Sequence, residues 1–224
     1  MVTWSYSSIK TFDQCPKKYY HLRVAKDVKD EGGPAAQYGT DVHKAAEDHV
    51  KSGVPIPPKF KYMEPVVTRL TALPGTKHTE LRLGLRKTNT GYAPCGFFDK
   101  DVWWRGVADF VAVDGRRGWS VDYKTGKNAR YADPKQLDLV AGALFVHFPE
   151  VRKIKSGLAY VVSDEWIEKK HTADMRDAYL SVFDEQLNGL EEAEATGVWN
   201  AKTGPLCGWC PVKTCEHWRP PRKK

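Results

Sequence analysis

An acidic residue interrupts an apolar segment in the middle of the chain. Residues 106–113 read Gly-Val-Ala-Asp-Phe-Val-Ala-Val, and Asp109 is the only charged residue among them. Branched and aromatic residues at this density favour a strand that is buried in a sheet. A carboxylate inside such a strand is costly unless a cation or hydrogen-bond donors compensate it. The segment therefore predicts a central sheet with a charged site built into it.

A hairpin loop is predicted directly after this strand. Residues 114–118 read Asp-Gly-Arg-Arg-Gly, a composition typical of a tight turn, and another strand is expected over 119–124. If Val113 pairs with Gly118 across the loop, the two strands run antiparallel beside each other through the sheet.

This pairing brings three charged side chains together. It places Asp109 opposite Asp122, and Lys124 shares a face with Asp122 because residues two apart in a strand point the same way. Two close carboxylates raise each other's pKa, and a divalent cation relieves their repulsion. Oxygen ligands suit Mg²⁺ or Mn²⁺, and phosphate oxygens commonly complete the shell. The group therefore suits metal-assisted hydrolysis of a phosphodiester, with a purely structural Asp–Lys–Asp network as the alternative.

Helical and extended patterns alternate along the rest of the chain, which indicates an α/β fold. The first 31 residues form an interrupted helical segment, with Ser5 and Ser7 as candidate caps and a break at Pro16. Further helices are expected over about 38–51, 134–147 and 173–195, and further strands over 79–85 and 158–162.

Three polar residues of these elements are able to join the charged site. Gln136 lies in the first turn of its helix, off the apolar stripe, and is able to hold a water or a phosphate. His43 points inward on its helix, and Glu80 lies opposite the leucine face of its strand. The alternatives are an exposed helix residue, a hydrogen-bonded core histidine and a solvated carboxylate.

Composition and charge narrow the class of protein. Hydrophobic residues make up 41% of the 224 residues, too much core-forming material for a disordered chain. No apolar stretch approaches the length that spans a bilayer, so no membrane association is expected. The first residues lack the pattern of a secretory signal, so we expect a cytoplasmic protein. Lys and Arg outnumber Asp and Glu by 35 to 28, and the net charge of +7 favours nucleic acid as a partner, or simply gives a basic surface.

Cysteines are clustered near the end of the chain. Residues 207–215 read Cys-Gly-Trp-Cys-Pro-Val-Lys-Thr-Cys. In a chain without an export signal, this spacing indicates metal ligation before disulfide bonding. Four thiolates are able to hold zinc or an iron–sulfur cluster, and spacing does not separate the two.

Five short motifs follow one another along the chain. They are Ser5-Tyr6-Ser7-Ser8-Ile9 with Phe-Asp-Gln-Cys-Pro-Lys-Lys-Tyr at 12–19, Gly39-Thr40-Asp41-Val42-His43, Gly106-Val107-Ala108-Asp109, Asp122-Tyr123-Lys124-Thr125-Gly126, and Gln136-Leu137. In this order, and with the cysteines, they resemble the RecB-like nucleases of the PD-(D/E)xK superfamily. The resemblance is greatest to the iron–sulfur branch, which includes the CRISPR-associated exonucleases and the AddB nuclease domain.

The resemblance implies a restriction-endonuclease-like fold, in which helices flank a mixed central sheet. It implies one nuclease domain over residues 1–224, with the nuclease core at 38–196. Residues 1–31 and 200–218 would form a lobe around the cysteine-ligated cluster.

The resemblance also implies roles for the site residues. Lys124 would orient the attacking water and stabilise negative charge, Gln136 would help to position the substrate, and Glu80 would support a second metal or the lysine. A tyrosine that the family often has four residues after the glutamine is replaced by Val140. The implied ligands of Mg²⁺ or Mn²⁺ are His43, Asp109, Asp122 and the carbonyl of Tyr123.

Cys15 is the fourth cluster ligand in this scheme. With Cys207, Cys210 and Cys215 it would bind a [4Fe–4S] cluster, or Zn²⁺ as the alternative. The cluster would clip the N-terminal helices to the C-terminal tail and close a loop of about 190 residues. Cys95 has no partner in this arrangement.

DNA is the substrate that the resemblance implies. Residues that flank the site and are able to grip phosphates or stack on bases are Lys17, Lys18, Lys127, Arg130 and Tyr131. We expect a metal-dependent DNA exonuclease that acts on single strands or duplex ends, in DNA recombination, repair or phage DNA processing. The alternatives are an endonuclease that processes structures or spacers together with recombination, CRISPR or phage replication proteins, and a non-catalytic DNA-binding subunit.

Overall fold

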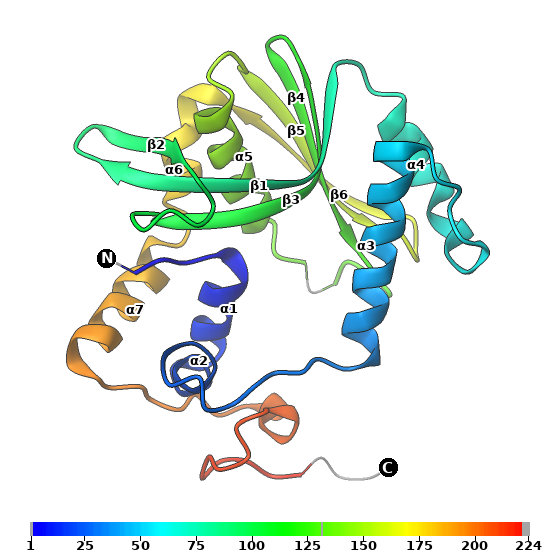
Figure 1. The fold of residues 1–224 in the computed structure, drawn as a ribbon. Helices are drawn as coiled ribbons and strands as arrows, with labels where there is room; N and C mark the ends of the chain where they lie inside the picture. The colour runs from blue at the N-terminus through cyan, green and yellow to red at the C-terminus, as the bar shows by residue number, and fades with distance from the viewer. Residues whose placement is uncertain (1, 131, 221–224) are drawn as a thin grey trace. The chain divides into compact units, whose positions relative to one another are not determined.

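The computed structural model describes residues 2–130 and 132–220 (Figure 1). Its internal contacts divide the chain into two compact units: residues 33–182 form one, and the residues up to 32 together with those from 183 onward form the other. No helix in the described ranges is long and apolar enough to cross a membrane.

The larger unit is built on a six-stranded mixed sheet with the order β2-β1-β3-β4-β5-β6. The pair β4–β5 is parallel and the other neighbours are antiparallel. Helices flank this sheet, which confirms the α/β class. The strands are β1 Thr76–Thr88, β2 Gly91–Cys95, β3 Trp104–Asp114, β4 Arg117–Lys124, β5 Lys153–Tyr160 and β6 Glu165–Thr172.

The hairpin of β3 and β4 has the register expected from the sequence. Val113 pairs with Gly118, and Gly115 in the turn has a φ of 56°, which a residue without a side chain adopts readily. The pairing runs through apolar positions and ends at the pair Phe110–Val121. The local alternation of side chains and the turn glycines are therefore sufficient to set this central pair of strands.

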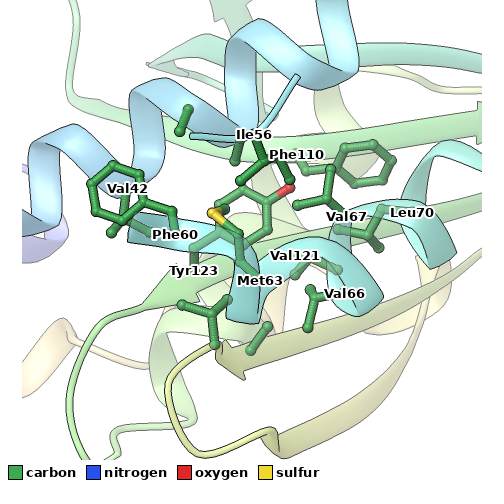
Figure 2. Packing of buried hydrophobic residues seen from close by; sticks show 14 of the residues in the cluster. Val42, Ile56, Phe60, Met63, Val66, Val67, Leu70, Phe110, Val121 and Tyr123 are labelled. Atoms are coloured by element: carbon green, nitrogen blue, oxygen red, sulfur yellow. The ribbon is translucent and has the colours of Figure 1, made fainter. Parts of the chain in front are cut away.

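Helices cover both faces of the sheet (Figure 1). On one side α3 (Pro34–Ser52), the 3₁₀ helix η2 (Pro58–Met63) and α4 (Glu64–Thr71) pack on apolar residues of β3, β4 and β5. Figure 2 shows this core with Val42, Ile56, Phe60, Met63, Val66, Val67, Leu70, Phe110, Val121 and Tyr123. On the other side α5 (Lys135–His147) packs on Leu158 and Tyr160 of β5.

Helix α5 is buried on most of its circumference, whereas the sequence predicted one apolar stripe. Leu139, Ala141 and Ala143 are fully buried although they lie outside the predicted stripe of Leu137, Val140, Leu144 and Phe148. The helix crosses from β4 to the parallel strand β5 and is covered in turn by α6 (Arg176–Leu180), whose Leu180 side chain lies within 2.9 Å of where a Cβ on Gly142 would stand. Because most of the surface of α5 is covered, apolar residues occur around most of the helix and not in a single stripe.

The smaller unit contains α1 (Tyr6–Gln14), α2 (Pro16–Tyr19), the π-helical turn η1 (Tyr20–Val24), α7 (Asp184–Thr196) and the 3₁₀ helix η4 (Pro205–Trp209). Ser5 caps α1 as expected: its hydroxyl accepts a hydrogen bond from the Ser8 amide at 3.2 Å, and the Ser8 hydroxyl accepts one from the Ser5 amide at 2.9 Å. Pro16 begins α2, so the predicted break after Cys15 is confirmed.

The single helix expected over 173–195 is wrong. The structure has the 3₁₀ turn η3 (Ala173–Met175), α6 and α7, with a break at 181–183. Leu180 is buried in the larger unit, and Phe183 is buried in the smaller unit against the rings of Trp4 and Tyr6. Leu180 and Phe183 are buried in the cores of different units, and the helix ends between them. The spacing of apolar residues along the sequence does not indicate to which core each residue belongs.

Two strands were missed in the sequence. Both lie at edges of the sheet, where one side is unpaired. Strand β6 is mostly polar, and β2 contains Pro94, so neither shows the apolar run of a central strand.

Candidate metal centre

A candidate metal centre lies where the pairing of β3 and β4 ends. Asp109 and Asp122 occupy the positions directly after the last pair, as the register predicted. His43 of α3, Glu80 of β1 and Asp109 each place one potential ligand atom so that all three atoms lie within 4.8 Å of one another. Carboxylates suit Mg²⁺ and Mn²⁺, and a nitrogen donor favours the transition metal of the two.

His43 connects helix α3 to the end of the hairpin. Its Nε2 lies 2.9 Å from the carbonyl oxygen of Tyr123, and its Nδ1 lies 3.3 Å from Oδ2 of Asp109. Burial lowers the pKa of His43, but the carboxylates of Asp109 and Asp122 outweigh it, and the pKa is raised above its ordinary value. If Nε2–H donates to the Tyr123 carbonyl, Nδ1 of a neutral ring has a lone pair that points at the Asp109 carboxylate, and the two repel each other. A proton or a metal ion between Nδ1 and the carboxylate replaces this repulsion with attraction. The geometry therefore fits a cation at this point.

Asp109 is held from the strand beside it. Its Oδ2 accepts a hydrogen bond of 2.8 Å from the amide of Tyr123, and the residue is 9% exposed. At the point where the strand pairing ends, the Asp109 carboxylate therefore accepts the hydrogen bond of the Tyr123 amide that a backbone carbonyl of β3 would otherwise accept. The same oxygen lies 3.3 Å from Nδ1 of His43, so the amide fixes the carboxylate beside His43 where no strand partner lies in front of it.

Glu80 reaches the centre through an unusual backbone conformation. Its φ is 49°, in the left-handed region, although β1 pairs regularly with β3 on either side, at Thr79–Phe110 and Leu81–Ala108. For a residue with a side chain this conformation costs about 1–3 kcal/mol. Burial raises the pKa of Glu80, and the charge of Asp109 raises it further. The sequence alternation placed Glu80 on the polar face but gave no sign of this distortion.

Asp122, Lys124 and Gln136 form a closed ring of contacts beside the centre. Lys124 Nζ lies 2.6 Å from Oδ2 of Asp122 and donates to Oε1 of Gln136 at 3.0 Å. Gln136 Nε2 donates to Oδ1 of Asp122 at 2.5 Å. Burial raises the pKa of Asp122, as does Asp109, while the Lys124 ammonium opposes the shift. The expected juxtaposition of Asp122 and Lys124 is therefore present, and the first turn of α5 adds Gln136 to it.

The remaining predicted contact residues fall into two groups. Lys127 and Arg130 are exposed in the segment that follows Lys124, and Tyr131 lies outside the described residues. In the smaller unit, Lys17 contacts Glu216, with 2.5 Å from Nζ to Oε2, and Lys18 donates to Gln14 at 3.2 Å.

The four cysteines of the expected cluster line one cavity of the smaller unit. The cavity has a volume of about 350 Å³, and its wall includes Cys15, Cys207, Cys210 and Cys215. All four are free of disulfides. Backbone amides approach two of the sulfur atoms, from Lys202 to Cys15 and from Gly204 to Cys207, each at 3.4 Å. Cys95 lies in the larger unit, at the end of β2.

A buried polar network escaped the sequence analysis. Asp138 on α5 contacts Nε2 of His171 at 2.9 Å and Nζ of Lys169 at 2.6 Å, and Nδ1 of His171 lies 3.3 Å from the Ser156 hydroxyl. Asp138 lies two residues after Gln136 and fixes α5 on the β5–β6 pair. The amphipathic pattern hid it, because Asp138 reads as a solvent-facing residue.

Comparison with known proteins adds a family match. The family model of the PD-(D/E)XK nuclease superfamily matches residues 3–215. The solved structure of SSO0001 is similar at 13% identity and a TM-score of 0.49, covering 96% of this chain and 86% of that one. A "putative exonuclease" from Eubacterium rectale is similar at 14% identity and a TM-score of 0.44, covering 98% and 89%. No curated protein matches the chain.

Proposed function

Because this chain belongs to the PD-(D/E)XK nuclease superfamily, we propose that it is a metal-dependent nuclease that hydrolyses phosphodiester bonds of DNA. The observation that carries the proposal is the convergence of His43, Glu80 and Asp109 within 4.8 Å, beside the ring of Asp122, Lys124 and Gln136. This places acidic ligands and a lysine at one end of the central hairpin.

The residues present fit a divalent cation. Nδ1 of His43 faces a carboxylate oxygen of Asp109 at 3.3 Å, and the pKa values of Glu80 and Asp122 are raised by burial and by Asp109. Each feature reports negative charge that a cation would offset. We propose His43, Glu80 and Asp109 as ligands, with Asp122 and the carbonyl of Tyr123 as the further ligands that the family resemblance implies. A bound Mg²⁺ or Mn²⁺ would polarise the phosphate and lower the pKa of a water.

Lys124 supplies positive charge where the substrate phosphate would develop negative charge. Its ammonium is held by Asp122 and by the Gln136 side chain, so its position is fixed before the substrate arrives. Gln136 also donates a hydrogen bond to Asp122, so it holds the Asp122 carboxylate and the Lys124 ammonium next to each other. In this proposal Lys124 orients the attacking water and Gln136 positions the substrate phosphate.

We propose exonucleolytic action on single strands or duplex ends, in recombination, repair or phage DNA processing. The support is the order of sequence motifs, and the rival is an endonuclease that works with partner proteins. Digestion of end-labelled linear and circular single-stranded DNA with Mn²⁺ separates them. An exonuclease degrades the linear form and leaves circles intact, whereas cutting of circles identifies an endonuclease.

Asp122→Asn tests the metal-dependent chemistry in the same assay. We expect cleavage to fall by at least about 100-fold, because the variant removes a charge from the reaction centre. Asp114→Asn is the matched control, since Asp114 lies at the far end of β3 and pairs with Arg117 at 3.0 Å. Equal cleavage by Asp122→Asn and wild type contradicts the proposed site, whereas no cleavage by the wild type favours a non-catalytic DNA-binding role.

We also propose that Cys15, Cys207, Cys210 and Cys215 bind a [4Fe–4S] cluster. They line one cavity, and amides directed at two sulfurs suit thiolates. Purification without oxygen, followed by assays of iron, sulfide and zinc, decides between the cluster and the zinc alternative.

A further inference from the structure

We propose that a surface patch on the larger unit binds single-stranded DNA that leads to the metal centre, an inference that rests on the proposed function. The aromatic–arginine patch consists of Arg82 on β1, Phe97 and Phe98 in the loop after β2, and Arg105 and Val107 on β3. Of these residues, only Val107 belongs to a motif of the sequence analysis.

Two guanidinium groups and two aromatic rings form the patch. The guanidinium of Arg82 lies 5.7 Å from the ring centres of both Phe97 and Phe98, and that of Arg105 lies 5.5 Å from Phe97. The two rings are 5.0 Å apart and nearly perpendicular, at 77°. Stacking on the rings limits the freedom of both arginine side chains while leaving their N–H groups able to bind phosphate.

The patch is exposed and its charge is not neutralised. Phe98 is 73% exposed and Val107 is 38% exposed, in a unit whose other large apolar side chains are mostly buried. No carboxylate of residues 2–130 or 132–220 forms an ion pair with Arg82 or Arg105. Phe97 lies near both unpaired cations, and the exposed Phe98 lies near Arg82. An exposed ring beside an unpaired cation does not stabilise a core, and it matches a ligand that carries both negative charge and flat apolar faces.

The loop that carries the rings has a defined conformation. The amide of Gly96 donates to Oδ2 of Asp99 at 2.7 Å, and the amide of Asp99 donates to the Gly96 carbonyl at 3.1 Å. A Cβ at Gly96 would come within 2.5 Å of the Asp99 carboxylate, so a side chain at this position would displace that carboxylate. Arg86 binds Asp101 at 2.6 Å and lies 3.7 Å from Asp99, so it neutralises the acids beside the patch.

The register aligns the patch with the metal centre. Arg105, Val107 and Asp109 are two residues apart along β3, so their side chains leave the same face of the strand. Arg82 lies opposite Val107 on the neighbouring strand β1. Four residues at about 3.3 Å each put Arg105 about 13 Å from Asp109 along the strand. A DNA strand with its reacting phosphate at Asp109 is therefore able to continue over Val107 to the rings.

These properties favour a single strand over a duplex. Unpaired bases expose their faces for stacking on aromatic side chains, and every base has such a face. In a duplex the bases are stacked on one another, and only the phosphate contacts of the arginines would remain. A ring pair held between arginines on the way to a nuclease centre therefore fits a single-stranded segment.

Fluorescence anisotropy of the full-length protein in EDTA tests the patch without cleavage. The probes are a labelled 20-nucleotide oligothymidylate and a blunt DNA hairpin of equal length. We expect Phe98→Ala to weaken binding of the oligothymidylate about tenfold and Phe98→Trp to retain it, since stacking supplies the contact. The Arg82→Ala/Arg105→Ala double variant should lower the slope of log K against log salt by about 1.4, for two phosphate contacts. Arg116→Ala, an exposed arginine in the β3–β4 turn, is the control and should not change binding.

Each outcome bears on the patch separately from the metal centre. Unchanged oligothymidylate binding in both patch variants overturns the inference, and so does an equal loss for the blunt hairpin, which would indicate a general phosphate site. The readout needs neither metal nor cleavage. A patch that binds single strands in a protein without metal-dependent cleavage therefore supports this inference while contradicting the proposed function.

Discussion

Replacing Asp109 with asparagine isolates the metal site from the fold. The asparagine side chain keeps an oxygen for the 2.8 Å hydrogen bond from the Tyr123 amide, but it loses the charge that faces His43 and Glu80. The variant loses the carboxylate that contacts Nδ1 of His43 at 3.3 Å, and it relieves the repulsion that helps to raise the pKa values of Glu80 and Asp122. These effects oppose each other, so we expect similar melting temperatures for the metal-free variant and wild type.

The effect of added metal should differ strongly between them. At a Mn²⁺ concentration ten times the dissociation constant, binding to the native state stabilises the wild type by about 1.4 kcal/mol. For a chain of this size that raises the melting temperature by about 3–6 °C. The shift should nearly vanish for Asp109→Asn, because the converging set loses one of its two carboxylates.

Thermal unfolding with EDTA and with Mn²⁺ measures both quantities in one experiment. Asp114→Asn, on the same strand but away from the converging set, should keep the wild-type shift. If Asp109→Asn shows the same metal-induced shift as wild type, the ion binds elsewhere and the reasoning from the converging ligands is refuted.

Three further predictions concern the lysine, the cysteines and a buried histidine. Lys124→Ala should lower Mn²⁺-dependent DNA cleavage by about 100-fold to 1,000-fold. The control Lys127→Ala changes an exposed neighbour and should keep most of the cleavage activity. An equal loss in both variants would contradict the proposed role of Lys124 in the reaction. Cys210→Ser should reduce the iron content of protein purified without oxygen and lower its melting temperature, while Cys95→Ser should leave iron unchanged; retained iron in Cys210→Ser contradicts the cavity as its site. Burial lowers the pKa of His171 in the folded protein. As pH falls below about 6.5, the unfolded state therefore binds a proton at His171 before the folded state does. Proton binding stabilises the unfolded state, so the contribution of His171 to the free energy of unfolding decreases. Urea unfolding at pH 7.5 and 5.5 should show a smaller pH dependence for His171→Gln than for wild type, and an undiminished dependence would contradict the assignment.

The parts of the fold that depend on local pattern were accessible from the sequence. The apolar strand around Asp109, the glycine-containing turn and the alternation of β4 were enough to predict the register that puts Asp109 opposite Asp122. The cap of α1 by Ser5 and the break at Pro16 follow from single residues whose chemistry acts on their immediate neighbours.

The parts that depend on distant contacts were not accessible. The left-handed backbone at Glu80 shows no local signature, because glutamate has no preference for it and only the surrounding sheet holds it there. The break between Leu180 and Phe183 arises because their partners lie in different units. The aromatic–arginine patch needs the loop after β2 to fold back over strands whose residues are distant in sequence.

The composition of the smaller unit has a consequence for biosynthesis. One wall of the cysteine cavity comes from Cys15 and its neighbours, and the rest comes from residues 201–218. A ribosome makes the first wall early and the second only after the whole larger unit has been translated. The sulfur site is thus completed only after residues 201–218 have been made, so loading of any inorganic group must follow translation of the larger unit. A nascent chain that stalls before that point leaves Cys15 without the other three cysteines of the cavity.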